Sequence, residues 1–231
     1  VTLNSDGELM EGSMWEAIMF AGSHELDNLI TFFDFNRIQN YSRIDDTNEL
    51  EPLADKLRAF NWEVVEIDGG SQAKSWASAL EHVKNNNFSD EQIIYFIEDD
   101  YLHLENWNKV LLEGFELKSE YISLYDHPDK YKLPIYQKLQ SKILLGKSCH
   151  WRTVPSTTLS FAVKFKTFKK HYKIYKKFNI IESGKTKDHE MFLDLWKNGS
   201  SLISSIPSYS SHMDLHWLAP TINWEEIFKK Y

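Results

Sequence analysis

The stretch that most constrains the fold runs from Gln92 to Tyr101, QIIYFIEDDY, in which an apolar run meets three adjacent carboxylates. Ile93 to Ile97 is apolar at every position, which is typical of a parallel-sheet strand that is covered on both faces. In open α/β sheets ligands bind beyond the carboxyl ends of the strands, so Glu98, Asp99 and Asp100 stand where a site is expected. Adjacent carboxylates repel one another, and a divalent cation relieves that repulsion. The stretch therefore predicts a metal site that could bind a diphosphate.

A simpler interpretation of the same carboxylates stays open. Acidic residues also follow strands as turn formers and as N-caps of the next helix, and Glu105 or Asn106 could begin such a helix. The acidic tripeptide alone does not separate the two interpretations.

Size and composition predict a folded α/β protein. The chain has 231 residues, with 8 Trp, 11 Tyr and 14 Phe, which is enough for one large domain or two small ones with a substantial core. The single cysteine, Cys149, excludes an internal disulfide and fits a reducing compartment. No apolar run approaches the roughly 18 to 20 residues that span a bilayer, and the amino terminus does not resemble a signal peptide. We therefore expect a cytoplasmic protein with no transmembrane segment.

The charge is distributed unevenly along the chain. Residues 1–70 carry 15 Asp and Glu against 4 Lys and Arg, whereas residues 71–231 carry 19 against 22. Such a shift indicates two segments of different origin. The one dense basic run, Lys164 to Lys177, is interleaved with Phe and Tyr at near-helical spacing. It predicts a solvated amphipathic helix, with a surface for anionic lipid or a polyanion as the alternative, and no nucleic-acid partner is expected.

The first segment has the periodicity of alternating strands and helices. Residues 1–3 resemble the end of a strand, and residues 8–22 have helical spacing. A strand is expected over 29–35, a short helix over 52–60 with Pro52 near its first turn, and another strand over 62–67. The order is β-α-β-α-β.

Two passages in this segment, SDGELMEGSMWEAIMFAGSHELDNLITFFDFNRIQ and LEPLADKLRAFNWEVVEIDG, resemble the amino-terminal thiamine-diphosphate domain of transketolase over residues 1–69. The resemblance implies that Asp6, Asn36 and the backbone carbonyl of Ile38 bind the divalent ion that carries the cofactor diphosphate. It also implies that Glu11 is the family's subunit-interface glutamate. Ser5 replaces the usual glycine of the motif, and the family's upstream histidines and second domain are not in the sequence. We therefore expect an incomplete site that needs a partner chain.

The second segment begins with a turn at residues 69–71. Helices are expected over 74–85 and 106–116, with the acidic strand between them and a further strand over 121–125. The motifs GSQAKSW, YFIEDDYLHLENW, YISLYDHPDKY, HWRTVPSTTLSFAVKF and DHEMF resemble nucleotide-sugar glycosyltransferases of the GT-A type from residue 70 onward. This resemblance implies that Glu98, Asp99 and Asp100 bind Mn or Mg and the donor diphosphate, although Glu-Asp-Asp replaces the usual Asp-x-Asp.

Other residues are assigned to the same predicted site. Asp188 or Glu190 could act as the catalytic base that takes the acceptor's proton, or they could merely begin the helix that follows. His212 is the candidate for a further metal ligand, with His216 as its competitor.

A substrate-binding group completes the prediction. Arg152 could pair with a phosphate while Trp151 stacks on a sugar or base, and Asp126 and His127 follow the strand at 121–125. The Trp151 and Arg152 stretch could equally form a surface turn.

These observations predict an α/β protein with a mostly parallel sheet and flanking helices, a GT-A or Rossmann-like three-layer sandwich. Residues 1–69 would supply its first βα units, residues 70–231 the glycosyltransferase-like segment, and one sheet would continue across the join. The predicted function is a metal-dependent glycosyltransferase that uses a nucleotide-diphosphate sugar and a glycan or small-molecule acceptor. One alternative is a transketolase-type transferase, as a fragment or split subunit that uses thiamine diphosphate. The other is a catalytically inert module.

Overall fold

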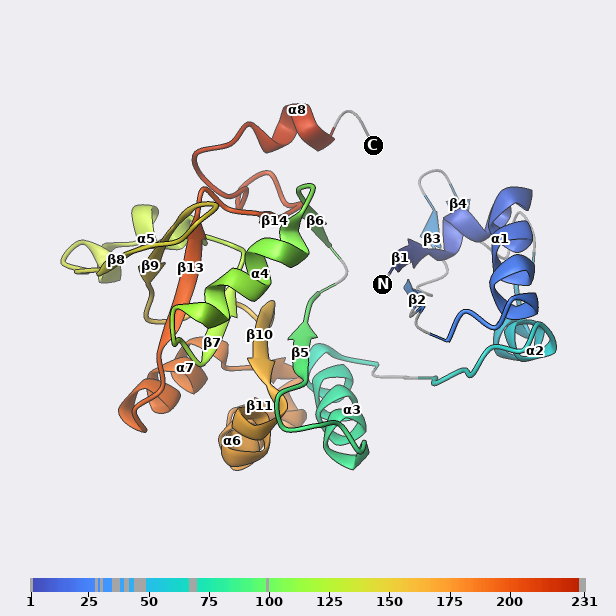
Figure 1. Cartoon of the computed structure of the whole chain (residues 1–231), viewed down its shortest axis with the longest axis horizontal. Coiled ribbons are helices and arrows are strands. Elements are labelled where there is room, and N and C mark those ends of the chain that lie inside the picture. Colours follow the sequence, from blue (N-terminus) through green and yellow to red (C-terminus); the bar gives the residue numbers. More distant parts are fainter. Residues whose placement is uncertain are drawn as a thin grey trace. The chain divides into compact units, whose positions relative to one another are not determined.

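The computed structural model describes residues 2–27, 29, 31–34, 38–39, 42–43, 49–66, 70–98 and 100–228. For residues 2, 3, 6, 32, 34, 38–39 and 42–43 it describes the backbone alone. The chain forms two compact units, Val1–Ile67 and Asp68–Tyr231. They are coloured blue to cyan and teal to red in Figure 1.

The first unit is built on a short parallel strand pair. Its elements are β1 (Thr2–Ser5), the 3-10 helix η1 (Asp6–Met10), α1 (Gly12–Ser23), β2 (Thr31–Asp34), β3 (Ile38–Gln39), β4 (Ser42–Arg43) and α2 (Leu53–Ala59). Strands β1 and β2 are parallel, in a register that runs from Thr2↔Thr31 to Ser5↔Asp34. Strands β3 and β4 form a separate antiparallel pair.

A small apolar core holds this unit together. Its buried members come from η1, α1 and α2 and from the segment before α2: Leu9, Ile18, Leu50, Leu53 and Leu57. Trp62 packs against this core, and its indole N–H donates to the carbonyl oxygen of Ile18 at 3.0 Å. Residues 62–66 have no regular structure, although a strand was expected there. Trp62 and Val64 pack against the core while Glu63 and Val65 are exposed, so successive side chains alternate over residues 62–65 without strand pairing.

The second unit contains a six-stranded sheet in the order β5-β10-β7-β13-β9-β8. The strands are β5 (Ile93–Phe96), β7 (Tyr121–Ser123), β8 (Ile143–Leu145), β9 (His150–Thr153), β10 (Phe161–Lys164) and β13 (Leu202–Ile206). The larger helices are α3 (Gln72–Asn85), α4 (Trp107–Glu116), α6 (Phe165–Lys177) and α7 (Asp188–Lys197).

Shorter elements complete the unit. They are β6 (Tyr101–His103), α5 (Asp129–Lys132), η3 (Pro134–Tyr136), β11 (Asn179–Ile180), η4 (Ile181–Ser183), β12 (Lys185–Thr186), β14 (Ser210–His212) and α8 (Trp224–Phe228). Strand β6 pairs with β14 and β11 pairs with β12, both antiparallel.

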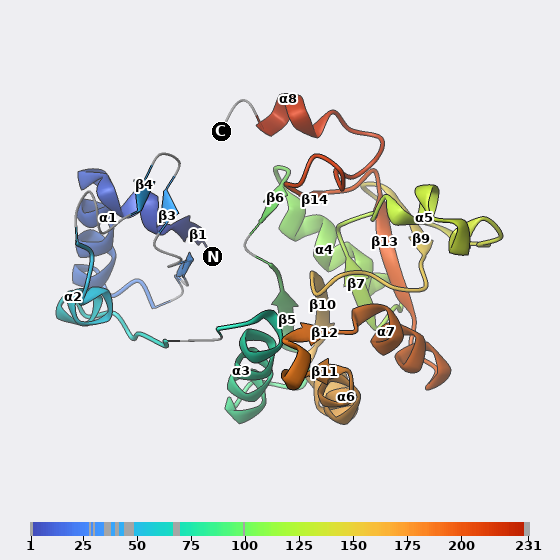
Figure 2. The same cartoon turned by 180° about the vertical axis from the view of Figure 1, so that it is seen from behind.

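Helices cover both faces of the sheet, which confirms the predicted three-layer α/β fold (Figures 1 and 2). Phe161 and Val163 of β10 lie in the core that contains α3, α6 and α7. Ala162 lies between them in the sequence and belongs to the opposite core, with Val110 and Leu111 of α4. Successive side chains of a strand point to opposite faces, so each central strand contributes to both cores.

The sheet is mixed. Strands β5, β7, β13 and β8 share one direction and β10 and β9 run against them, so β7 and β13 are the parallel neighbours among its pairs. Strand β5, expected to have a parallel neighbour, pairs antiparallel with β10. Its continuous apolar sequence reflects burial by helices on both faces, and burial does not fix the direction of the next strand. The continuation of one sheet across residue 69 is not among the described pairings and stays a prediction.

Gly114 provides a test of the packing between α4 and the sheet. A methyl group at this position would lie 2.7 Å from Cγ2 of Ile122 and 2.9 Å from Cη2 of Trp151, and both side chains are fully buried. Gly114→Ala gains about 1 kcal/mol of helix propensity, but overpacking costs about 1–3 kcal/mol. We expect a net loss of stability in urea unfolding. Leu112→Ala, on the exposed side of α4, should change stability by less than about 0.5 kcal/mol; equal effects of the two changes would contradict this packing.

Candidate functional site

In the first unit, the two parallel strands end together. The register pairs Ser5 with Asp34, the last residues of β1 and β2. Helix η1 begins at Asp6, directly after β1. The side chain of Asp6 and the whole of Asn36 lie outside the described residues, whereas Ile38 begins β3 with a described backbone. The carboxyl ends of parallel strands are where α/β proteins bind ligands, so this edge is the candidate cofactor site.

Glu8 shapes the turn at this edge, and the sequence analysis did not single it out. The backbone N–H of Ser5 donates to Oε2 of Glu8 at 2.7 Å, as in a capping box. The pattern that could have revealed it is Ser-x-x-Glu over residues 5–8. Glu11 follows η1, its backbone carbonyl accepts a hydrogen bond from Met14 N–H at 3.1 Å, and its side chain is exposed.

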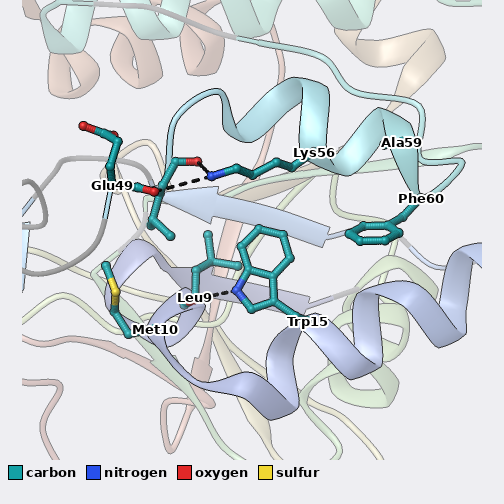
Figure 3. A pocket seen from close by; sticks show the side chains of 8 residues that line it. Leu9, Met10, Trp15, Glu49, Lys56, Ala59 and Phe60 are labelled. Carbon is teal, nitrogen blue, oxygen red and sulfur yellow. Dashed lines mark hydrogen bonds between the residues drawn. The ribbon is translucent and has the colours of Figure 1, made fainter.

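An apolar pocket of about 470 Å³ lies in the same unit (Figure 3). It is lined by Leu9, Met10, Trp15, Glu49, Leu50, Lys56, Ala59 and Phe60. The Lys56 ammonium donates to the carbonyl oxygens of Glu49, Leu50 and Glu51 at 3.4, 2.8 and 3.2 Å. An ammonium group has three N–H donors, so these three hydrogen bonds use all the donors of Lys56. The hollow suits an apolar group rather than a diphosphate.

In the second unit, two carboxylates of the acidic stretch after β5 contact different side chains. Oε1 of Glu98 accepts a hydrogen bond from Nε2 of Gln72 at 3.3 Å. Oδ2 of Asp100 lies 2.8 Å from Nε2 of His212, because the β6–β14 register pairs Tyr101 with His212. Asp99 lies outside the described residues. Within the part of the chain that the structure describes, no three His, Cys, Asp or Glu side chains are grouped closely enough to hold a metal ion.

Asp126 and Arg152 form a buried ion pair. Oδ1 of Asp126 accepts from Nε of Arg152 at 2.9 Å and also from Nη2, and Oδ2 accepts from the Tyr131 hydroxyl at 2.6 Å. The guanidinium expected to bind a phosphate is therefore engaged inside the protein. The neighbouring Trp151 has no exposed surface, and its indole N–H donates to Glu113 at 3.3 Å, so its ring packs in the core.

His127 takes part in a second ionic group beside this pair. Its Nδ1 and the Nζ of Lys130 each lie 3.0 Å from Oδ1 of Asp129. These two contacts lower the pKa of the Asp129 carboxyl against the opposing effect of burial. The structure therefore brings His127 near charged groups of its own chain.

Asp188 and Glu190 lie in the first turn of α7. Burial raises the pKa of Asp188, while the N–H of His189, which donates to its Oδ1 at 2.8 Å, opposes that shift. Glu190 is exposed. Nδ1 of His189 lies 3.0 Å from the Ser156 hydroxyl and 3.1 Å from that of Tyr136. The geometry is that of a polar cluster at a helix start.

The amino-terminal segment matches a known family. Residues 1–93 match the family model described as "Transketolase, thiamine diphosphate binding domain". The chain is 48% identical over 83 residues to the 6-deoxy-6-sulfo-D-fructose transketolase subunit SqwG of Clostridium sp. (strain MSTE9), covering 36% of this chain and 30% of that protein. It is 40% identical over 67 residues to an apulose-4-phosphate transketolase subunit of Phocaeicola vulgatus, covering 29% and 24%. It is 39% identical over 66 residues to the transketolase of Rattus norvegicus, covering 29% and 11%.

These matches confirm the transketolase resemblance of the amino-terminal segment. The chain spans about a third or less of the length of these relatives. The family match extends past residue 69 through α3 to the first residue of β5, into the region that the motifs assigned to the glycosyltransferase-like segment. The GT-A resemblance is not supported, and the prediction of a metal-dependent glycosyltransferase with a nucleotide-sugar donor is wrong. The Mn or Mg site and the donor and acceptor partners predicted with it have no support either.

The buried pair predicts a large effect of one substitution. Asp126→Ala leaves the Arg152 guanidinium buried without its carboxylate, and breaking a buried pair costs about 3–5 kcal/mol. Urea unfolding should show this loss. Asp90→Ala removes the exposed carboxylate that pairs with Lys169 and should cost less than about 1 kcal/mol. Similar losses of stability in the two variants would contradict the assignment of Asp126 and Arg152 as a buried ion pair.

His103 predicts a pH dependence of stability. Nε2 of His103 lies 2.9 Å from the Tyr95 hydroxyl, and burial lowers the pKa of His103 to about 4. The unfolded state therefore binds a proton near pH 6.5, before the folded state does, and stability falls as the pH is lowered from there. Between pH 7 and pH 5 this residue contributes a loss of about 2 kcal/mol. His103→Phe should remove that part of the slope, whereas His82→Gln, at an exposed site on α3, should keep it; an unchanged slope in His103→Phe would contradict the assignment.

Proposed function

We propose that the amino-terminal segment is part of the thiamine-diphosphate-binding region of a transketolase-type transferase. The observation that carries the proposal is the parallel register of β1 and β2, which ends both strands at one edge with Asp6 immediately after the first. The family match over residues 1–93 covers this edge.

The donor set that the resemblance assigns to this edge would fit a cation that carries a diphosphate. Asp6 and Asn36 offer side-chain oxygens and Ile38 a backbone carbonyl, which are the hard ligands that Mg²⁺ prefers. Asn36 is two residues beyond the end of β2, and Glu8 fixes the turn in which Asp6 lies. In the proposed site these three residues bind and orient the diphosphate end of the cofactor. Thiamine diphosphate, when bound, supplies carbanion stabilisation.

We further propose that the site is completed by a partner chain. Two of the relatives are named as transketolase subunits. A ligand pocket normally encloses most of its ligand, and two short strands enclose little. Glu11, exposed at the start of α1, is the residue that the resemblance places at the subunit interface.

Binding of the cofactor tests the proposal directly. Because the residues proposed to hold the cation and the diphosphate all belong to this chain, thiamine diphosphate with Mg²⁺ should give a heat of binding in calorimetry and raise the melting temperature of the chain even without a partner. At a free ligand concentration about ten times Kd, the stabilisation is about 1.4 kcal/mol. Thiamine with Mg²⁺ should have no effect, because it lacks the diphosphate that the cation would hold.

Two variants identify the residues responsible. Asp6→Asn should abolish the response to thiamine diphosphate, since the cation loses its charged ligand. Asp55→Asn is the matched control, because Asp55 is an exposed residue of α2 that pairs with Arg58. The proposal fails if thiamine diphosphate gives no Mg²⁺-dependent response, or if Asp6→Asn responds as the control does.

A further inference from the structure

One long part of the second unit carries positive charge without any negative charge. Residues 130–181 contain 13 Lys and Arg and no Asp or Glu. Seven of these cations lie in or beside α6, where the sequence showed its densest basic run. Acidic residues elsewhere in the chain pair with six of the seven: Lys164 and Lys166 with Glu91, Lys169 with Asp90, Lys170 with Glu120, Lys176 with Glu81 and Lys177 with Asp194. Helix α6 is therefore largely neutralised.

The other basic region, which we call the 132–147 segment, is not neutralised in this way. It runs from the end of α5 through η3 and β8, at one edge of the unit (Figures 1 and 2). Lys147 pairs with Glu116 at 2.7 Å. For Lys132, Lys138 and Lys142 no carboxylate of the described residues lies within ion-pair distance; Lys132 donates instead to the carbonyl oxygen of His216.

Large aliphatic side chains of the same segment face solvent. The exposed fractions are 41% for Leu133, 72% for Ile135, 57% for Ile143 and 75% for Leu145. Ile143 and Leu145 share one face of β8, and Leu144 between them packs on the core below. Strand β8 is the last of the sheet, so no described strand covers its outer side.

The buried side chain of Tyr136 holds the 132–147 segment in this conformation. Tyr136 is buried, and its hydroxyl lies 3.2 Å from that of Ser156 and 3.1 Å from Nδ1 of His189. Backbone bonds from Tyr136 to Leu133 and from Leu139 to Tyr136 close successive turns around it. Because Tyr136 occupies the space below η3, Ile135 remains outside. The exposed aliphatic groups are thus presented by an ordered segment.

Lysines beside an edge strand commonly prevent that strand from pairing with another molecule. That role accounts for Lys142 but not for four exposed aliphatic side chains in the same sixteen residues. Aliphatic groups interspersed with lysines, and no carboxylate, match the surface of an anionic bilayer, where apolar groups enter the interface and ammonium groups meet lipid phosphates. None of the helices in the described ranges is long and apolar enough to cross a bilayer.

We propose that the 132–147 segment docks on anionic lipid surfaces, with Ile135 and Leu145 inserted at the interface and Lys138 and Lys142 on the headgroups. The charge of the lysines favours an anionic lipid, and the exposed aliphatic side chains favour a bilayer over a soluble polyanion. This proposal is independent of the cofactor site in the first unit.

Vesicle sedimentation with the full chain tests the proposal. The chain should sediment with vesicles of phosphatidylcholine and phosphatidylglycerol (7:3) in 0.1 M NaCl, and not with phosphatidylcholine alone. Each lysine at the surface contributes roughly a fivefold increase in partitioning, so K138Q/K142Q should weaken binding roughly 25-fold. Ile135→Ser with Leu145→Ser should weaken it on the order of tenfold or more, since both side chains lose apolar burial. Raising NaCl to 1 M should weaken binding by the wild type.

Matched controls separate this surface from general charge and hydrophobicity. K166Q/K169Q makes the same charge change on α6, and Leu112→Ser replaces an exposed leucine of α4. All variants lie on the surface, and melting temperatures should verify that they fold. The proposal is overturned if the chain does not bind the anionic vesicles, if the controls weaken binding as much, or if the Ile135 and Leu145 changes leave binding intact.

Discussion

Burial of the central strands on both faces is the constraint on which the second unit depends. In β7, Tyr121 faces the core with α6 and α7 while Ile122 faces α4, and neither has exposed surface. A strand without a solvent side requires that the polar groups at its end be paired within the protein. Asp126 follows β7 and is paired with Arg152 of β9. The carboxylate and the guanidinium that looked available for a substrate are therefore engaged by the fold itself.

The positions of helices and strands were predicted from the sequence more accurately than the pairing of the strands with one another. A helix expected over 74–85 is α3, which begins at Gln72 because the Ser71 side chain accepts a hydrogen bond from Lys74 N–H at 3.3 Å. Helical spacing and caps are local properties, so such helices can be read from the residues that form them. The neighbour of β5 is β10, whose residues follow more than sixty positions later, and nothing within β5 encodes its direction. Trp151 was expected to stack on a sugar or base, but it is buried in β9. A Trp beside an Arg reads the same in a surface site and in a buried strand, so these two residues alone do not distinguish the two places.

The two family resemblances differed in the length of sequence that supported them. The transketolase-like passages are nearly continuous over residues 1–69, and the family match confirms them. The glycosyltransferase-like motifs were short and separated, and their centre was an acidic tripeptide of a kind that also ends ordinary strands. Asp100 and His212, both assigned to the predicted metal site, are paired with each other in the structure. Proximity of two polar residues follows from strand pairing and does not by itself define a reaction.

The location of the positive charge shows what composition can and cannot predict. The excess of basic residues after residue 70 was evident, and Lys164 to Lys177 was its densest run. Folding brings Glu91, Asp90 and other carboxylates from distant parts of the chain to those lysines. The less dense lysines at 138 and 142 keep their charge unpaired among the described residues, beside aliphatic groups that Tyr136 and the end of the sheet leave outside. A charged surface is what remains after tertiary pairing, so the density of lysine along the sequence does not by itself locate that surface.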